Sequence, residues 1–218
     1  MNSSVVYIDH MGDDNSIVNA ARVSFNKDAA HFTPEQNANL IRYLATHGHW
    51  TPFAHAVLSL RFTAPIAIHA QCVKHQIGFA MNTVSRRYVS DTPDYIFPVW
   101  RSKPTGSIKQ GSGGIVTDGR RTIADDLYYG VCIDAINAYD KMVNELDIAP
   151  EQARFILPQG VFTEWVWTGS LQAWARFYNQ RSDPHAQQEI QELAKMVDDI
   201  ISPLFPVSWE HITNKKDD

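Results

Sequence analysis

The chain has 218 residues, of which 44% are hydrophobic and 20% charged, and its formal net charge is -5 at pH 7. This composition is typical of one globular domain, and no apolar run approaches the roughly 18 residues that span a membrane. The net negative charge argues against attraction of the whole protein to nucleic acid, so a bound anion would need a local cluster of cations. From the length and composition we expect a single domain, residues 1–218. The first residues lack the features of a secretory signal and the chain has only two cysteines, so we expect it to be located in the cytoplasm.

The first predicted helix begins after Thr33. Pro34 follows at the first helical position and Gln36 comes three residues after Thr33, which is the pattern of a capping box. Gly48 suits the end of this helix. The next stretch, residues 55–63, alternates apolar and polar side chains, which predicts a half-buried strand. Its predicted inward residues are Ala56, Leu58, Leu60 and Phe62.

A second helix is predicted to start near Pro65. Its apolar residues recur every three or four positions, which predicts a buried stripe along one side. The stripe consists of Ile66, Ala70, Val73 and Ile77. Gln71, Lys74 and His75 have the spacing that would place them together on another face of this helix.

Residues 102–121 are rich in Gly, Ser and Thr and show no periodicity, so we expect a long loop. Its GSGG run lacks the Lys-Ser or Lys-Thr ending of a phosphate-binding loop. A long helix is predicted from Ile123 onward, with an apolar stripe that we expect to belong to the core. The stripe comprises Leu127, Val131, Ala135, Ala138, Met142 and Leu146. A short helix from Pro150 is expected to carry Arg154.

Three further elements are predicted near the C-terminal end. Residues 161–168 are rich in β-forming residues, which predicts a strand. A helix is predicted over residues 170–181. A further helix is expected after it, with Asp183 as its cap and Pro184 in its first turn. The inward residues are Leu171, Trp174 and Tyr178 in the first helix and Ala186, Ile190, Leu193 and Val197 in the second. Helices predominate and do not alternate regularly with strands, so we expect an α+β domain with a small, mostly antiparallel sheet packed against several helices.

Histidines gather in the stretch HGHWTPFAH, which contains His47, His49 and His55. A catalytic zinc site needs three protein ligands, and no Asp, Glu or Cys stands nearby to complete a usual set. We therefore expect no metal. Capping or satisfying buried groups is an equally good interpretation of His47 and His55. Cys72 lies near the predicted apolar stripe, and we expect a buried, inert thiol there.

Several arginines occur in the company of uncharged hydrogen-bonding side chains. Arginine offers a planar fork to phosphate and a flat face to bases or flavins. Each arginine alone is an ordinary surface charge, but the combination is typical of nucleotide recognition. The arginines are Arg86, Arg87, Arg154, Arg176 and Arg181, and the uncharged companions are Gln71, Asn82, Thr83, Gln172 and Asn179.

Six blocks of the chain resemble the flavin-dependent thymidylate synthases, in the family's order and approximate spacing. They are AARVSF (20–25), HGHWTPFAH (47–55), API (64–66), QCVKHQIGFAMNTVSRRY (71–88), ARFILP (153–158) and RSDPHAQQEI (181–190). The family signature is Arg-His-Arg, seven residues and then Ser. Here Lys74, His75 and Gln76 are followed by eight residues and then Ser85, and Thr83 stands where the family usually has Glu.

The resemblance implies an enzyme of nucleotide biosynthesis that methylates dUMP to dTMP. Methylenetetrahydrofolate would supply the carbon, FAD would carry the hydride and NADPH would reduce the flavin. The resemblance also implies a homotetramer with active sites at subunit interfaces, and a reaction that uses no cysteine nucleophile on dUMP.

Carried over residue by residue, the resemblance implies two sets of contacts and one catalytic group. The implied FAD contacts are Ser24, His49, Thr51, Lys74, His75, Gln76, Thr83, Ser170, Gln172 and Arg176. The implied dUMP contacts are Gln71, Lys74, Ser85, Arg86, Arg87, Arg154 and Arg181. Arg181 is similar to the arginine at the uracil ring, where a cation within about 4–6 Å favours the ionised form of its neighbour. It would stabilise a uracil anion and so make C5 nucleophilic.

Two other functions stay open at this point. One is a nucleotide-binding or regulatory protein on the same fold, with catalysis lost through Gln76 and Thr83, which would bind dUMP without turnover. The other is a metal hydrolase built on His47, His49 and His55, which a stoichiometric transition metal would favour.

Overall fold

The structure is a computed structural model that describes residues 2–105 and 111–213. The chain forms two compact units, each assembled from separate stretches. The first unit comprises residues 1–3, 63–72 and 83–165, and the second unit comprises residues 4–62, 73–82 and 166–218. The expectation that residues 1–218 act as one domain stays a prediction.

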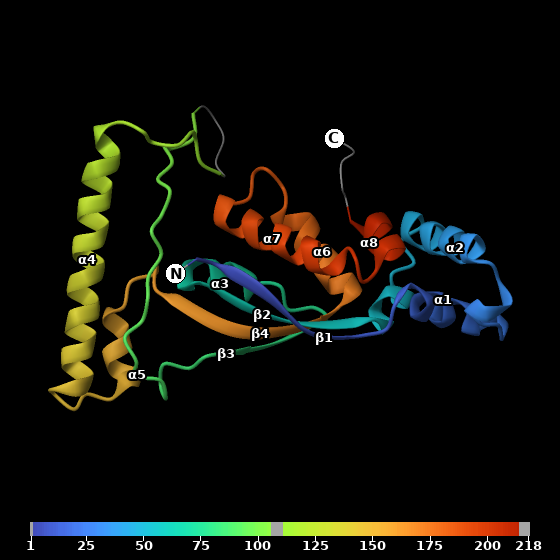
Figure 1. Ribbon diagram of the computed structural model, residues 1–218, viewed down its shortest axis with the longest axis horizontal. Coiled ribbons are helices and arrows are strands. Elements are labelled where there is room, and N and C mark those ends of the chain that lie inside the picture. Colours follow the sequence, from blue (N-terminus) through green and yellow to red (C-terminus); the bar gives the residue numbers. More distant parts are fainter. Residues whose placement is uncertain (1, 106–110, 214–218) are drawn as a thin grey trace. The chain divides into compact units, whose positions relative to one another are not determined.

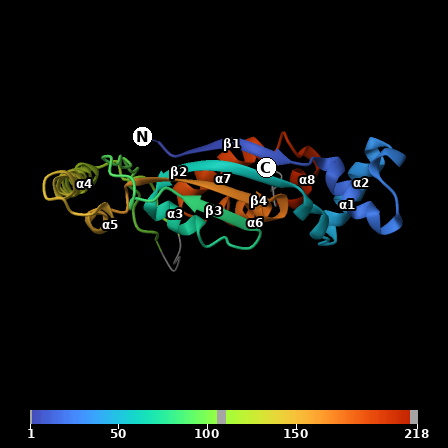
Figure 2. The same cartoon turned by 90° about the horizontal axis from the view of Figure 1, so that it is seen from below.

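A four-stranded sheet has the strand order β1-β2-β4-β3 (Figure 2). The strands are β1 (Ser4–Met11), β2 (Val57–Pro65), β3 (Phe79–Thr83) and β4 (Phe162–Ser170). The hydroxyls of Ser59 and Thr168 are hydrogen-bonded at 2.8 Å, and the amide of Ile66 donates to the carbonyl of Val161. Residue numbers therefore rise along one strand as they fall along its partner, so β2 and β4 are antiparallel. The predicted α+β class with a small sheet and several helices is confirmed.

The alternation predicted for β2 is confirmed, since Leu58, Leu60 and Phe62 are fully buried. In the second unit the Phe62 ring stacks on Trp174 with centroids 5.9 Å apart, and Trp167 meets Trp174 edge to face at 5.0 Å. The indole Nε1 of Trp174 donates to the carbonyl of Leu58 at 3.3 Å. Because Trp174 belongs to the helix that follows β4, this cluster fixes that helix on the sheet.

The second unit contains several helices, two of which pack against the sheet. The helices are α1 (Asp14–Arg22), α2 (Pro34–Thr46), α6 (Leu171–Arg181), α7 (Gln188–Ile201) and α8 (Pro206–Ile212), with 3-10 turns η1 (Val23–Phe25), η2 (Ala29–His31) and η3 (Thr51–His55). The capping box of α2 is confirmed: Thr33 and Gln36 each accept the other's amide hydrogen through their side chains. α7 packs against α6 and β1 (Figure 1).

The first unit contains α3 (Ile66–Cys72), α4 (Gly119–Asn144), α5 (Pro150–Ala153) and the 3-10 turn η4 (Arg154–Ile156). α4 packs against α5 and η4 (Figure 1). The side of α4 that is buried carries Cys132, Ile136 and Tyr139. Arg154, expected on the short helix, lies in the turn that directly follows it.

The core assignment of the α4 stripe is wrong. Leu127 and Val131 are 67% and 63% exposed, and Leu146 is exposed as well. Ala135, Ala138 and Met142 are only half-buried. Two apolar faces compete on this helix, and the face with Cys132 and Ile136 is the one that packs. Periodicity identifies an apolar face but does not say which of two faces the rest of the chain covers.

The helix predicted near Pro65 begins as expected but ends at Cys72. Ile68 and Cys72, four residues apart, are its buried positions, so the predicted stripe is wrong. None of its members is fully buried: Ile66 is half-buried, and Ala70, Val73 and Ile77 are exposed. The burial of Cys72 itself agrees with the expectation of an inert thiol.

Lys74 and His75 lie beyond this helix, and they do not share a helical face with Gln71. The backbone turns after Cys72 and reaches Gly78 with φ +80°, a left-handed conformation that glycine adopts readily. The residues after Cys72 are therefore placed by their contacts with α6 rather than by helical spacing.

Two boundaries in the C-terminal half also differ from expectation. α7 begins at Gln188 rather than after Asp183, because the Asp183 carboxylate accepts the amide hydrogen of His185 and forms a local turn. On α6, Phe177 is fully buried while the expected Tyr178 is half-buried.

The predicted loop at residues 102–121 ends earlier than expected, because Asp118 caps α4 and the helix starts at Gly119. Residues 106–110 of the predicted loop lie outside the described residues. Within the part of the chain that the structure describes, no helix combines the length and the apolar content needed to cross a bilayer.

Candidate active site

The segment at residues 75–78 runs along α6, where three hydrogen bonds hold it. The Ser170 amide donates to the carbonyl of Gly78 at 3.1 Å, and Nη2 of Arg176 donates to the carbonyl of Ile77 at 3.1 Å. Nε of Arg181 donates to Nε2 of His75 at 2.9 Å. The partners follow in opposite order along the two stretches, so the segment is antiparallel to the helix. The N-cap, a middle residue and the last residue of α6 therefore each hold one residue of the 75–78 segment in place.

Gly78 makes the close approach to α6 possible. A Cβ at this position would lie 3.0 Å from the Cβ of Ala173 and 3.2 Å from Oγ of Ser170. Its φ of +80° is also one that other residues rarely adopt. Both the backbone conformation and the available space therefore require glycine.

His75 is held between aromatic rings and two guanidinium groups. Its ring meets the ring of Phe177 edge to face at 5.2 Å and that of Trp167 at 6.3 Å. Burial, followed by the positive charges of Arg181 and Arg176, lowers the pKa of His75 to about 4. The imidazole is therefore neutral at neutral pH, and its Nε2 serves as the acceptor for Arg181.

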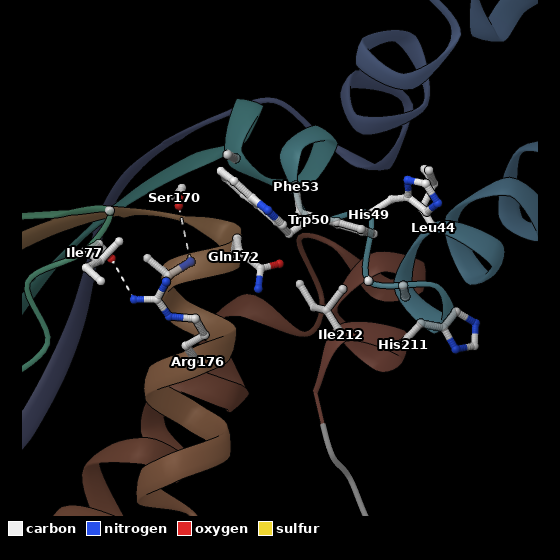
Figure 3. Close-up of a pocket in the computed structure, with 15 residues that line it drawn as sticks. Leu44, His49, Trp50, Phe53, Ile77, Ser170, Gln172, Arg176, His211 and Ile212 are labelled. Atoms are coloured by element: carbon white, nitrogen blue, oxygen red, sulfur yellow. Dashed lines mark hydrogen bonds between the residues drawn. The ribbon is translucent and has the colours of Figure 1, made fainter.

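A pocket of about 720 Å³ lies beside this segment (Figure 3). Its walls come from the end of α2, η3, residues 77–78, the first half of α6 and the end of α8. The side chains with distinct chemistry are Trp50, Phe53, Ser170, Gln172, Arg176 and His211. The volume lies in the range of small-molecule sites.

The pocket combines flat apolar surfaces with one guanidinium. Trp50 and Phe53 provide aromatic rings, and Gln172 provides an amide that both donates and accepts. Figure 3 shows Arg176 reaching toward Ile77, to which it donates its hydrogen bond. This arrangement suits a planar heteroaromatic ligand that carries an anionic group.

The expected FAD contacts are only partly brought together. His49, Ser170, Gln172 and Arg176 all line this pocket. Lys74, His75 and Gln76 lie on the adjoining stretch, Thr51 begins η3 next to Trp50, and Ser24 lies in η1. Thr83, at the end of β3, belongs to the first unit.

Thr83 has a histidine partner that the sequence did not suggest. Its Oγ1 lies 3.0 Å from Nε2 of His69, whose ring meets Trp165 edge to face at 4.7 Å. Burial lowers the pKa of His69. In place of the carboxylate usual in the resembling family, the chain thus has a hydroxyl paired with an imidazole within the first unit.

The expected dUMP contacts divide between the two units. Those of the first unit are Gln71, Ser85, Arg86, Arg87 and Arg154, and those of the second are Lys74 and Arg181. Within the first unit, the amide and Nε of Arg87 both donate to Oγ of Ser85 at 3.3 Å. Arg86 donates to the carbonyl of Asp91 at 2.6 Å. The turn after β3 therefore gathers two guanidiniums and a hydroxyl.

Sequence reasoning missed part of the pocket. Trp50 and Phe53 stand inside the HGHWTPFAH block, and their aromatic character was the available signal. His211 and Ile212 come from α8, which sequence patterns did not predict. No motif marks these two residues, because only the packing of α8 against α2 brings them here.

The histidines of HGHWTPFAH have other roles in the structure. Nδ1 of His47 lies 2.8 Å from the carbonyl of Tyr43, and the two rings stack at 4.0 Å. His49 lines the pocket. Among the described residues, no three His, Cys, Asp or Glu side chains gather in a way that would hold a metal ion.

Comparison with known proteins places these features in a family. A family model described as thymidylate synthase complementing protein matches residues 7–207. The flavin-dependent thymidylate synthase of Thermosipho africanus is 35% identical over 203 residues, which is 93% of this chain and 87% of the relative. A flavin-dependent thymidylate synthase of Thermus thermophilus is 33% identical over 202 residues, which is 93% of this chain and 72% of the relative.

A solved structure has the same fold. The UMP/dUMP methylase PolB from Streptomyces cacaoi, bound with 5-Br dUMP, superposes with a TM-score of 0.86. The match covers 96% of this chain and 94% of that one at 24% sequence identity. The family model, the relatives and the shared fold agree with the six sequence blocks: the chain belongs to the thymidylate synthase complementing protein family.

Proposed function

We propose that the protein is a flavin-dependent thymidylate synthase. It methylates dUMP to dTMP, with methylenetetrahydrofolate as the carbon donor, FAD as the hydride carrier and NADPH as the reductant. The observation that carries the proposal is the pocket beside α6, which both Trp50 and the Arg176 guanidinium line, in a chain 35% identical to an enzyme of that name.

The pocket fits the flavin cofactor by size and chemistry. The exposed ring of Trp50 offers a face for a planar ring system, and Arg176 offers a guanidinium for a phosphate. Bound FAD would supply the hydride chemistry, while the protein positions it. The other FAD contacts are proposed from the family resemblance, and they are Ser24, Thr51, Lys74, Gln76 and Thr83.

Arg181 is the proposed catalytic group. A fixed cation beside the uracil ring favours the ring's anionic form, which makes C5 a better nucleophile. The bond from its Nε to His75 supports this role, because a catalytic cation must be held in one orientation. Electrostatic activation of this kind needs no nucleophile from the protein.

The turn after β3 is the proposed phosphate site for dUMP. Ser85 and Arg87 are already linked within it, and Arg86 stands between them. Arginine and hydroxyl donors are well suited to a phosphate. Gln71, Lys74 and Arg154 complete the proposed substrate contacts.

The proposed assembly is a homotetramer with active sites at subunit interfaces. The stripe on α4 supports it, because Ile123, Leu127 and Val131 are 62%, 67% and 63% exposed and lie four residues apart. An apolar helix face of this length on a soluble enzyme is typical of a protein interface. A second copy of the chain is the proposed occupant.

The cysteines fit an enzyme of a reducing compartment. Cys72 and Cys132 are free and buried. A cytoplasmic location and a mechanism without a cysteine nucleophile are therefore part of the proposal.

A nucleotide-binding protein without turnover is the second candidate. The observation in its favour is that Gln76 and Thr83 stand at positions where the resembling family carries charge. Such a protein would bind dUMP yet show no flavin-dependent turnover.

One preparation tests both candidates. Purified protein should be yellow or take up added FAD, and dUMP should change its flavin absorption spectrum. With NADPH and methylenetetrahydrofolate it should form dTMP, and UMP is assayed in parallel because the structural relative PolB is a UMP/dUMP methylase. Spectral changes without product, or dUMP binding without FAD uptake, would support the second candidate, and protein that binds neither FAD nor dUMP would contradict both.

A further inference from the structure

Arg181 and His75 form a half-buried pair between helix α6 and the 75–78 segment. They are 106 residues apart in the chain, and Nε of Arg181 donates to Nε2 of His75 at 2.9 Å. This distance is that of a well-formed N–H hydrogen bond. The pair joins the last residue of α6 to the first residue of the segment.

The surroundings make His75 an acceptor. Arg176 and Arg181 of α6 are the charged groups acting on it, and both disfavour a protonated ring. The flanking rings of Phe177 and Trp167 are uncharged. An imidazole with an unprotonated Nε2 carries its hydrogen on Nδ1, which defines the tautomer.

The bond also constrains the guanidinium. Of the five N–H donors of Arg181, the Nε–H is the one nearest the aliphatic stem, and fixing it sets the plane of the whole planar group. A long side chain otherwise loses considerable rotamer entropy when it must hold one orientation. An acceptor built into the fold makes that ordering part of folding rather than part of substrate binding.

We propose that His75 is a positioning residue for Arg181: it accepts the Nε–H as a neutral imidazole and so orients the guanidinium toward the uracil ring. This inference rests on the proposed function of Arg181. It differs from the role implied by the resemblance, in which His75 contacts the flavin.

A double-mutant cycle separates the two roles. His75→Leu removes the acceptor and keeps an apolar contact with Phe177, and His75→Gln keeps an acceptor oxygen. We expect His75→Leu to lower kcat for dTMP formation roughly tenfold or more with FAD content unchanged, and His75→Gln to restore part of the loss. In an Arg181→Ala background, His75→Leu should then cause little further loss, as for residues that act as a unit.

His47→Leu is the matched control, because it removes a histidine that lies outside the pair, and kcat should stay near that of the wild type. Equal fold losses from His75→Leu in both backgrounds would overturn the proposal. So would a His75→Leu protein that folds, by circular dichroism, but has lost its FAD, because that result would identify a flavin contact.

A second measurement is independent of turnover. Nitrogen-15 NMR of the histidine side chains should show an unprotonated Nε2 in His75 of the wild type, and the signal of that nitrogen should shift in Arg181→Ala. A proton on Nε2 would overturn the proposal, since such a tautomer cannot accept. A wild type that makes no dTMP would remove the proposed function, while the NMR spectrum would still decide whether the hydrogen bond exists.

Discussion

Nη2 of Arg176 donates a hydrogen bond to the carbonyl oxygen of Ile77 at 3.1 Å, and the same guanidinium borders the pocket beside α6. The residue thereby links the backbone of the 75–78 segment to the surface offered to a ligand. Its charge also helps to keep His75 neutral.

Arg176→Ala should weaken FAD binding. A hydrogen bond to a charged group is worth about 1.5–3 kcal/mol, which corresponds to a rise in Kd of roughly tenfold to a hundredfold. Flavin fluorescence titration measures it. Arg42→Ala removes an exposed arginine of α2 that donates to Asn39, and it should leave the Kd unchanged. An unaltered Kd in Arg176→Ala would place the flavin phosphate elsewhere.

Gly78→Ala should destabilise the protein through both backbone strain and contact with Ala173. Alanine substitutions at two other glycines separate strain from contact. Gly48 has φ +69° with nothing within 4 Å of an added Cβ, so it reports the strain alone, and Gly130 has neither a positive φ nor a close neighbour. The left-handed conformation costs about 1–2 kcal/mol. We expect Gly48→Ala to lose about that much free energy of unfolding and Gly78→Ala to lose more.

Gly130→Ala lies in the interior of α4, where alanine is favoured over glycine by about 1 kcal/mol, so it should be neutral or stabilising. Urea unfolding of the three variants gives the comparison. Equal losses at positions 48 and 78 would mean that the segment can move away from α6 without cost.

Stability should fall as the pH is lowered from 6.5 toward 4. The pKa of His75 is lowered from 6.5 to about 4, so in this window the unfolded chain takes up a proton that the folded protein does not. The unfolded state then binds more protons, and acid favours it. His75→Gln should show a smaller loss of unfolding free energy across this window than the wild type. Identical pH dependence in urea unfolding would show that His75 is protonated normally in the folded protein.

A charge on the α4 stripe should weaken assembly without unfolding the chain. Leu127→Lys and Val131→Lys replace side chains that are 67% and 63% exposed, so their cost to the isolated fold should be small. Sedimentation velocity should show smaller species than for the wild type. Asp126→Lys, on α4 outside the stripe, is the control and should assemble normally. Unchanged sedimentation of the stripe variants would place the interface elsewhere.

Interactions between near neighbours in sequence were predictable. Thr33 and Gln36 form the expected capping box because both partners lie within one helical turn. The alternation around Leu58 and Leu60 marked β2 because a strand exposes its sides at a fixed period of two. In both cases the information is contained in fewer than ten residues.

Features that depend on tertiary packing were not predictable. The face that α4 buries is chosen by α5 and η4, and α3 ends at Cys72 because the following residues bind α6. His75 and Arg181 meet across 106 residues, which no local pattern reports. The family resemblance named several residues that line the pocket, whereas the presence of His211 in the pocket could be seen only in the structure.

Formation of dTMP by the purified protein, supplied with FAD, dUMP, NADPH and methylenetetrahydrofolate, tests the central claim most directly. We predict dTMP that depends on protein-bound FAD, dUMP, NADPH and methylenetetrahydrofolate, and loss of most turnover in an Arg181→Ala protein that remains folded and binds FAD. Absence of dTMP from flavin-loaded wild-type protein would contradict the proposed function, and near-normal turnover in Arg181→Ala would contradict the role assigned to that arginine.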